Sequence, residues 1–124
     1  MLTFRRLLFP LALAALVLGI LPALPASAHS VSKEVGTQGL RRGTGYIDSV
    51  HGYIEVCDTL ADNWGVRIHY LTSTGGSGLK GDANGSAGGC GSLQLAWPEH
   101  FTFATLCTGV NGADTACVVL HDWI

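Results

Sequence analysis

The sequence is poor in charged residues, and the basic ones are the scarcer kind. Its 124 residues include 7 Lys and Arg against 9 Asp and Glu. Two of the basic residues, Arg5 and Arg6, lie at the extreme N-terminus, so the rest of the chain is still more acidic. Proteins that bind nucleic acid or anionic membranes need a basic face. The composition therefore predicts neither of these partners.

The sequence also lacks the motifs that identify common catalytic and metal sites. No serine lies in a Gly-x-Ser-x-Gly turn, the turn that presents a nucleophile between a strand and a helix. No Cys-x-x-Cys or His-x-x-x-His spacing offers a zinc site. Beyond the first 28 residues, no segment keeps a helical period for more than one or two turns. These absences favour an all-β protein without catalytic residues, a cofactor or a metal.

The most distinctive feature that is present is an apolar run over residues 7–24, directly after the two arginines. It leads into a segment with small residues at Ala26 and Ala28, the pattern that signal peptidase cleaves. We therefore expect a signal peptide over 1–28, cleavage after Ala28, and a secreted, extracellular protein. No basic cluster follows to retain the chain in a membrane, so we expect no membrane association after cleavage.

The rest of the sequence has the pattern of short β-strands. Apolar and polar residues alternate, and clusters of Gly, Asn and Asp interrupt them. We expect a flexible N-terminal arm over 29–44, adding at most one edge strand, and a disulfide-bonded β domain over 45–124. The expected fold is a small immunoglobulin-like sandwich or compact barrel of about six to seven short antiparallel strands. The clearest strands are expected at 53–57, 66–71, 92–97, 101–107 and 117–120.

Two stretches leave alternatives open. Residues 46–58 are either two short strands joined by a turn at His51-Gly52 or one bulged strand. Residues 72–91 hold eight glycines. Glycine is costly to order, so this stretch is either a mobile loop or a hairpin of weak strands. Within it, residues 82–85 (Asp-Ala-Asn-Gly) predict a tight turn, because Asn-Gly tolerates positive φ.

The chain has four cysteines, an even number that favours a disulfide framework in an oxidising compartment. Three pairings are possible. Cys107 ends one expected strand and Cys117 begins the next, with an Asn-Gly turn between them, so both lie at the base of one hairpin. The preferred pairing is therefore Cys107–Cys117 together with Cys57–Cys90, which spans the glycine-rich stretch.

Trp64 lies in an expected turn, where packing does not require a large side chain. With Asp62 and Asn63 it forms the candidate binding site, because a solvent-facing indole beside polar groups stacks on a sugar ring or a partner surface. The competing interpretation is that Trp64 covers one end of the core.

His29 becomes the N-terminal residue if cleavage follows Ala28. A terminal amine, its own imidazole and a second histidine bind copper, since nitrogen ligands suit this ion. The alternative is that His29 is only a polar residue after a cleavage site. The second ligand would be one of His51, His69, His100 and His121.

Four side chains carry oxygen atoms of the kind that calcium prefers. Their spacing is not that of an EF-hand, and turn formation by Asp and Asn explains them without an ion. The sequence therefore predicts no metal at these positions. The four are Asp58, Asp62, Asp82 and Asn84.

Several short motifs are spread along the chain: Val56-Cys57-Asp58, Asp62, Gly65-Val66, Tyr70, Asp82-Ala83-Asn84-Gly85, Cys107 and Cys117. With these motifs the chain resembles a group of small uncharacterised exported proteins of filamentous actinomycetes. The resemblance implies a compact disulfide-bonded β domain and no particular activity. Residues 82–87 are also similar to a segment of the neocarzinostatin-type chromoprotein carriers, which are two-disulfide immunoglobulin-like sandwiches. Those carriers close two short disulfide loops and this chain has one short spacing, so their carrier function is not implied.

These observations favour a secreted, non-catalytic binding or surface-interaction module with an unknown extracellular ligand or protein partner. Such a module requires an exposed aromatic or apolar patch. An inhibitor or toxin-like protein is the alternative, and it requires a rigid protruding loop, for which residues 108–116 are the candidate. A small copper protein using His29 is a further alternative. An enzyme requires a pocket with at least two convergent titratable groups. The sequence leaves the oligomeric state open.

Overall fold

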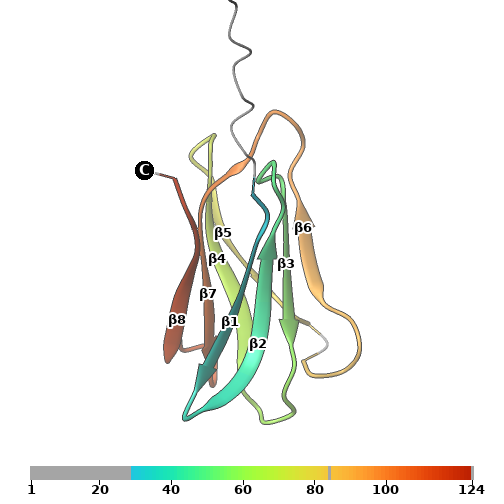
Figure 1. The fold of residues 1–124 in the computed structure, drawn as a ribbon, viewed down its shortest axis with the longest axis vertical. Coiled ribbons are helices and arrows are strands. Elements are labelled where there is room, and N and C mark those ends of the chain that lie inside the picture. Colours follow the sequence, from blue (N-terminus) through green and yellow to red (C-terminus); the bar gives the residue numbers. More distant parts are fainter. Residues whose placement is uncertain (1–28, 84, 124) are drawn as a thin grey trace, which may run out of the picture.

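The computed structural model describes residues 29–83 and 85–123, which form two antiparallel sheets packed face to face (Figure 1). The first sheet has the strand order β1-β2-β3-β6 and the second the order β5-β4-β7-β8. No helix occurs in this part of the chain, and the expected signal peptide lies outside it. The strands are β1 (Val31–Thr37), β2 (Leu40–Ile47), β3 (Tyr53–Asp58), β4 (Gly65–Thr72), β5 (Ser77–Gly81), β6 (Gly91–Gln94), β7 (Phe101–Gly109) and β8 (Ala116–Asp122).

The fold is the all-β sandwich that the sequence predicts, but the described residues form eight strands instead of six or seven. The flexible arm expected over 29–44 is the largest difference, because this segment is built into the first sheet. β1 pairs with β2 from Val31 opposite Ile47 onward, and β2 pairs with β3. The inward positions of β2 include Gly43 and Gly45, so the strand lacks the apolar alternation that identifies one.

The stretch over 46–58 is two strands joined by a turn, the first of the two alternatives. Asp48 holds this turn, because its Oδ1 accepts hydrogen bonds from the amides of Gly52 at 2.8 Å and Tyr53 at 3.0 Å. His51 adopts a positive φ of 55° within the turn.

The glycine-rich stretch is a hairpin that includes a true strand. β5 pairs with β4, with Gly78 opposite Tyr70. A Cβ on Gly78 would lie 2.3 Å from the Tyr70 hydroxyl, so this glycine makes room for the phenol. After β5 the amide of Gly85 donates to the carbonyl of Asp82 at 3.3 Å, as the expected tight turn requires.

The core lies between the two sheets. Inward glycines on β2 let the second sheet fill the space that side chains would take: a Cβ on Gly45 would lie 3.0 Å from Leu106 Cδ1. The edge strands of the two sheets are also in contact: β1 packs against β8, and β5 packs against β6. The largest apolar core side chains, each fully buried, are Ile47, Ile54 and Val56 from the first sheet and Ile68, Phe101 and Leu106 from the second.

Both disulfides pair as the sequence predicts, Cys57 with Cys90 and Cys107 with Cys117. Cys107 and Cys117 lie directly opposite each other on β7 and β8. Cys57 connects β3 to the segment that precedes β6. Each sheet thus carries one disulfide on its outer side, at positions that alternate with the core residues.

Candidate functional site

The two sheets present different chemistry to the outside. Side chains along each strand alternate between the core and the outer side. On the first sheet the outer side chains are mostly polar, and we call this surface the polar face. Its members include Glu34, Thr44, Tyr46, Tyr53, Glu55, Ser92 and Gln94.

The outer side of the second sheet instead combines polar side chains, such as His69, Ser77 and Thr105, with several large apolar ones. Leu71, Leu79 and Val119 are 48%, 54% and 50% exposed. Leu71 lies opposite Phe103, which is half-buried. We call these four residues the apolar face, and they come from all four strands. An antiparallel sheet with one face in water is normally polar on that face, so this surface has the character of a contact surface.

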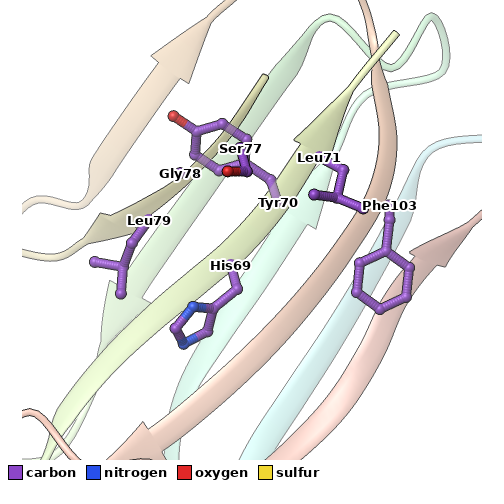
Figure 2. Close-up of a pocket in the computed structure, with 7 residues that line it drawn as sticks. All are labelled: His69, Tyr70, Leu71, Ser77, Gly78, Leu79 and Phe103. Carbon is purple, nitrogen blue, oxygen red and sulfur yellow. The ribbon is translucent and has the colours of Figure 1, made fainter. Parts of the chain in front are cut away.

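A groove of about 440 Å³ crosses the apolar face. Figure 2 shows His69 in this groove, between Leu79 and Phe103. His69 Nε2 lies 2.7 Å from Asp114 Oδ2. An ionised carboxylate only accepts hydrogen bonds, so Nε2 donates to it. The groove therefore combines apolar walls with polar groups that include the His69 ring and the Ser77 hydroxyl.

The loop over 108–116, the candidate projecting loop, is tied to the second sheet. Asp114 bonds His69 and also lies with its Oδ1 3.0 Å from Arg67 Nε. The Arg67 guanidinium donates to the carbonyl of Ala113 at 3.3 Å. These contacts hold the loop against β4 and give it a fixed position.

Trp64 is half-buried, and its indole is packed by a cation. The Arg42 guanidinium carbon lies 3.9 Å from the ring centroid. Arg42 is 4% exposed, donates to Thr37 Oγ1 at 2.8 Å and forms an ion pair with Asp62. The turn thus has a rigid internal support that the sequence did not indicate, because Arg42 lies in the segment expected to be a flexible arm.

The three residues predicted as a binding site do line one pocket, of about 350 Å³. Asp58, which is 7% exposed, and Ser86 also line it. Burial raises the pKa of the Asp58 carboxyl. We call this the Trp64 pocket; its lining also includes Leu60, Ala61 and Gly85.

The two most exposed tryptophans are ones that the sequence did not single out. Trp97 is 85% exposed and Trp123 is 62% exposed. The alternation over 92–97 predicts a strand with Leu93, Leu95 and Trp97 on one face, but β6 ends at Gln94.

Two clusters of possible metal-ligating side chains occur among the described residues, and neither contains His29 or the calcium candidates. Groups of three ligand atoms within 4.8 Å occur at Glu55 with one disulfide and at His69 and Asp114 with the other. Their cysteines are disulfide-bonded, and metals bind the thiolate. Neither group includes an expected pair of ligands. The calcium candidates Asp58, Asp62 and Asp82 are in neither, and Asn84 lies outside the described residues; the copper candidate His29 is also in neither.

Two histidines form a buried pair where the two sheets meet. His51, from the β2–β3 turn, stacks on His121 of β8 with ring centroids 4.1 Å apart. Trp123 packs its ring 5.2 Å from that of His51. The two histidines are 9% and 8% exposed, and burial lowers the pKa of each. Their geometry suits a neutral pair, because a charge on either ring would be poorly solvated.

The part of the chain that the structure describes holds no helix long and apolar enough to cross a membrane. Comparison of the chain with protein-family models, with curated proteins and with solved structures gave no match.

Proposed function

We propose that the protein is a non-catalytic binding module that works outside the cell and holds a protein partner on its apolar face. The contrast between the two outer surfaces carries this proposal. Both belong to four-stranded antiparallel sheets of one sandwich, yet the second exposes several large apolar side chains among its polar ones, unlike an ordinary solvated sheet. Exposed Leu71, Leu79 and Val119 lower the solubility of the protein. A bound partner that covers these side chains would explain why they are exposed.

The extracellular location rests on the covalent framework and on the expected signal peptide. All four cysteines are in disulfides. Disulfides persist in oxidising compartments and are rare in the cytosol. A small domain of this kind also depends on such links, because its core alone gives little stability.

The shape of the groove favours a protein over a small molecule. Small-molecule sites bury most of the ligand surface, whereas the walls here are leucines about half exposed. A protein partner would insert an aliphatic or aromatic side chain into the groove, in the manner of an interface hot spot. Polar groups of the partner would form hydrogen bonds with the His69 ring and the Ser77 hydroxyl.

Site-specific cross-linking tests the proposal. A photo-reactive residue is placed at Leu79 on the apolar face and, in a matched variant, at Tyr46 on the polar face. The exported protein is then irradiated in the medium of its producing cells. We expect one protein to be linked from position 79 and not from position 46. Its binding is then measured with purified components and compared with the L71S/L79S variant.

Loss of a buried leucine contact costs about 1.5 to 3 kcal/mol, so the double variant is expected to bind at least about 100-fold more weakly. Both leucines are about half exposed, so the fold should tolerate the change. Equal linking from both positions, or unchanged affinity of L71S/L79S, would contradict the proposal. A small molecule in place of a protein, found by native mass spectrometry, would contradict the partner class.

A further inference from the structure

The Trp64 pocket lies on loops, away from the apolar face, and its walls are fixed by internal hydrogen bonds. One wall is the end of β3, with Asp58, and the β3–β4 loop, with Asn63 and Trp64; the other is the loop before β6, which carries Ser86. The amide of Leu60 donates to Asp58 Oδ1 at 3.1 Å, and the amide of Trp64 donates to Asp62 Oδ1 at 2.9 Å. These bonds preorganise the first wall.

The indole of Trp64 is held in place before any ligand arrives. Arg42 packs on it at 3.9 Å and is itself fixed by Thr37 and Asp62. A second link ties the same loop to β2, since the amide of Thr59 donates to the carbonyl of Arg42 at 2.9 Å. A ligand that stacks on Trp64 therefore loses little affinity to ordering of the ring.

The polar groups of the pocket select the chemistry of that ligand. Asp58 and Asp62 supply carboxylate acceptors, Asn63 an amide that both donates and accepts, and Ser86 a hydroxyl. The basic side chain beneath them, Arg42, is 4% exposed and is already engaged by Asp62. An anionic ligand would meet two carboxylates there, so phosphorylated, sulfated and uronic acid groups are disfavoured.

We propose that the Trp64 pocket binds a neutral saccharide. The apolar face of a pyranose ring stacks on the indole of Trp64. The hydroxyls of the sugar donate to the carboxylate of Asp58 and to Asp62 Oδ1, because Asp62 Oδ2 is buried against Arg42. They also exchange hydrogen bonds with Asn63 and Ser86. This pairing of one aromatic platform with several converging polar groups is what a polyhydroxylated ring requires.

The proposal is independent of the protein partner, because the two sites share no residue. It also explains why Trp64, and not the more exposed Trp97, is the expected contact. Trp97 is 85% exposed, but Trp64 is the tryptophan that lines a pocket with carboxylate, amide and hydroxyl groups.

Calorimetric titration with defined oligosaccharides tests the proposal. The probes are cellohexaose, chitohexaose and mannohexaose as neutral saccharides, and an oligogalacturonate of equal length as the anionic comparison. We expect at least one neutral probe to bind and the oligogalacturonate to bind at least tenfold more weakly. Calcium chloride alone is titrated in parallel, because the same carboxylates suit that ion.

Three pocket variants and one control locate the site. W64A is expected to weaken binding at least tenfold. N63G and S86A are each expected to weaken it severalfold without harming the fold, because Asn63 already has a φ of 63° and Ser86 is exposed. W97A removes an exposed tryptophan elsewhere and should bind as wild type does. The denaturation midpoint of each variant shows whether it is folded.

The outcomes separate clearly. Binding that falls in N63G and S86A but not in W97A supports the proposal, even if W64A does not fold. No binding of any neutral probe, binding of calcium alone, equal binding of oligogalacturonate, or binding that survives N63G and S86A would overturn it.

Discussion

The polar face and the apolar face belong to two sheets of the same size and the same antiparallel pairing, and they differ in what they show to solvent. The polar face has Glu34 and Glu55 among its outer side chains, whereas the apolar face has Leu71 and Leu79. The core does not need these leucines, because they point away from it. The difference is therefore not a requirement of the core, and the proposal that the apolar face is a contact surface rests on it.

The two faces also differ in how their disulfides are placed. Cys57–Cys90, on the polar side, joins residues 33 apart, whereas Cys107–Cys117, on the apolar side, joins residues 10 apart. The chain-entropy account ties the stabilisation to the length of the closed loop, because a longer loop loses more freedom in the unfolded state.

Removal of the disulfides should therefore give the largest effects, and unequal ones. The double variant C57S/C90S is expected to lose about 4 kcal/mol of unfolding free energy, and C107S/C117S about 3 kcal/mol. Urea denaturation, monitored by tryptophan fluorescence, measures both. If C107S/C117S loses more unfolding free energy than C57S/C90S, loop length does not determine which disulfide stabilises the fold more. The proposed difference between the two faces would then be wrong.

The sequence predicted the disulfides and the strands with clear alternation, such as β4 and β7, because these depend on local pattern. It failed at β2, where Gly43 and Gly45 occupy inward positions. Side chains from the other sheet, Val66 and Leu106, fill the space above them. When the side chains of the opposite sheet fill the core above a strand, the sequence of that strand shows no apolar alternation.

The apolar face shows a second limit of the sequence. The sequence contains Leu71 and Leu79, but whether they lie on the same face of the sheet depends on the strand register. Leu79 lies opposite His69, and Phe103 opposite Leu71. A slip of one residue would turn each side chain to the opposite side of the sheet. The Trp64 pocket was predicted in part, since Asp62, Asn63 and Trp64 adjoin in sequence, but its support by Arg42 is a long-range contact.

Ion pairs give a second comparison of the faces, with a smaller effect. On the apolar side, Asp114 pairs with Arg67, whose side chain is 11% exposed. D114N is expected to cost about 1 to 2 kcal/mol, because the Arg67 charge loses its partner in a largely buried position. On the polar side, Glu34 pairs with Arg41, and both side chains are more than half exposed.

E34Q is the matched control and is expected to change the unfolding free energy by less than about 0.5 kcal/mol. Chemical denaturation of the two variants at low and high salt tests the pair of predictions. Equal losses in D114N and E34Q would contradict the claim that burial distinguishes the two ion pairs.

Acid should lower the stability of the fold at the stacked pair of His51 and His121, where the two sheets meet. Burial lowers the pKa of His51 and of His121 below the ordinary value of 6.5. A depressed folded-state pKa means that the neutral pair stabilises the fold fully above the unfolded value of about 6.5. This contribution is lost as the pH falls through the lower folded-state values.

Two charges then face each other across ring centroids 4.1 Å apart, with His100 adding to the repulsion and Asp48 and Asp122 reducing it. The urea midpoint is expected to fall between pH 7.5 and pH 5. In H51N, whose asparagine suits the positive φ of 55°, the fall should be smaller. An equal fall in H51N would show that other groups cause the acid sensitivity.

The smallest expected effect lies on the polar face, at Tyr53. Its hydroxyl donates to Glu55 Oε2 at 2.9 Å, and this bond raises the pKa of Tyr53 above its ordinary value of 10.0 because ionisation would break it. A raised pKa means that the stabilisation is present below about pH 10 and is lost as the pH rises through the folded-state value. Ultraviolet titration of phenolate should therefore show Tyr53 ionising at a higher pH than its ordinary value in the folded protein.

E55Q should return the pKa of Tyr53 toward the ordinary value. Y53F should leave the urea midpoint at neutral pH unchanged, because the bond lies on a solvated surface. A clear loss of stability in Y53F would mean that the polar face, too, carries contacts on which the fold depends.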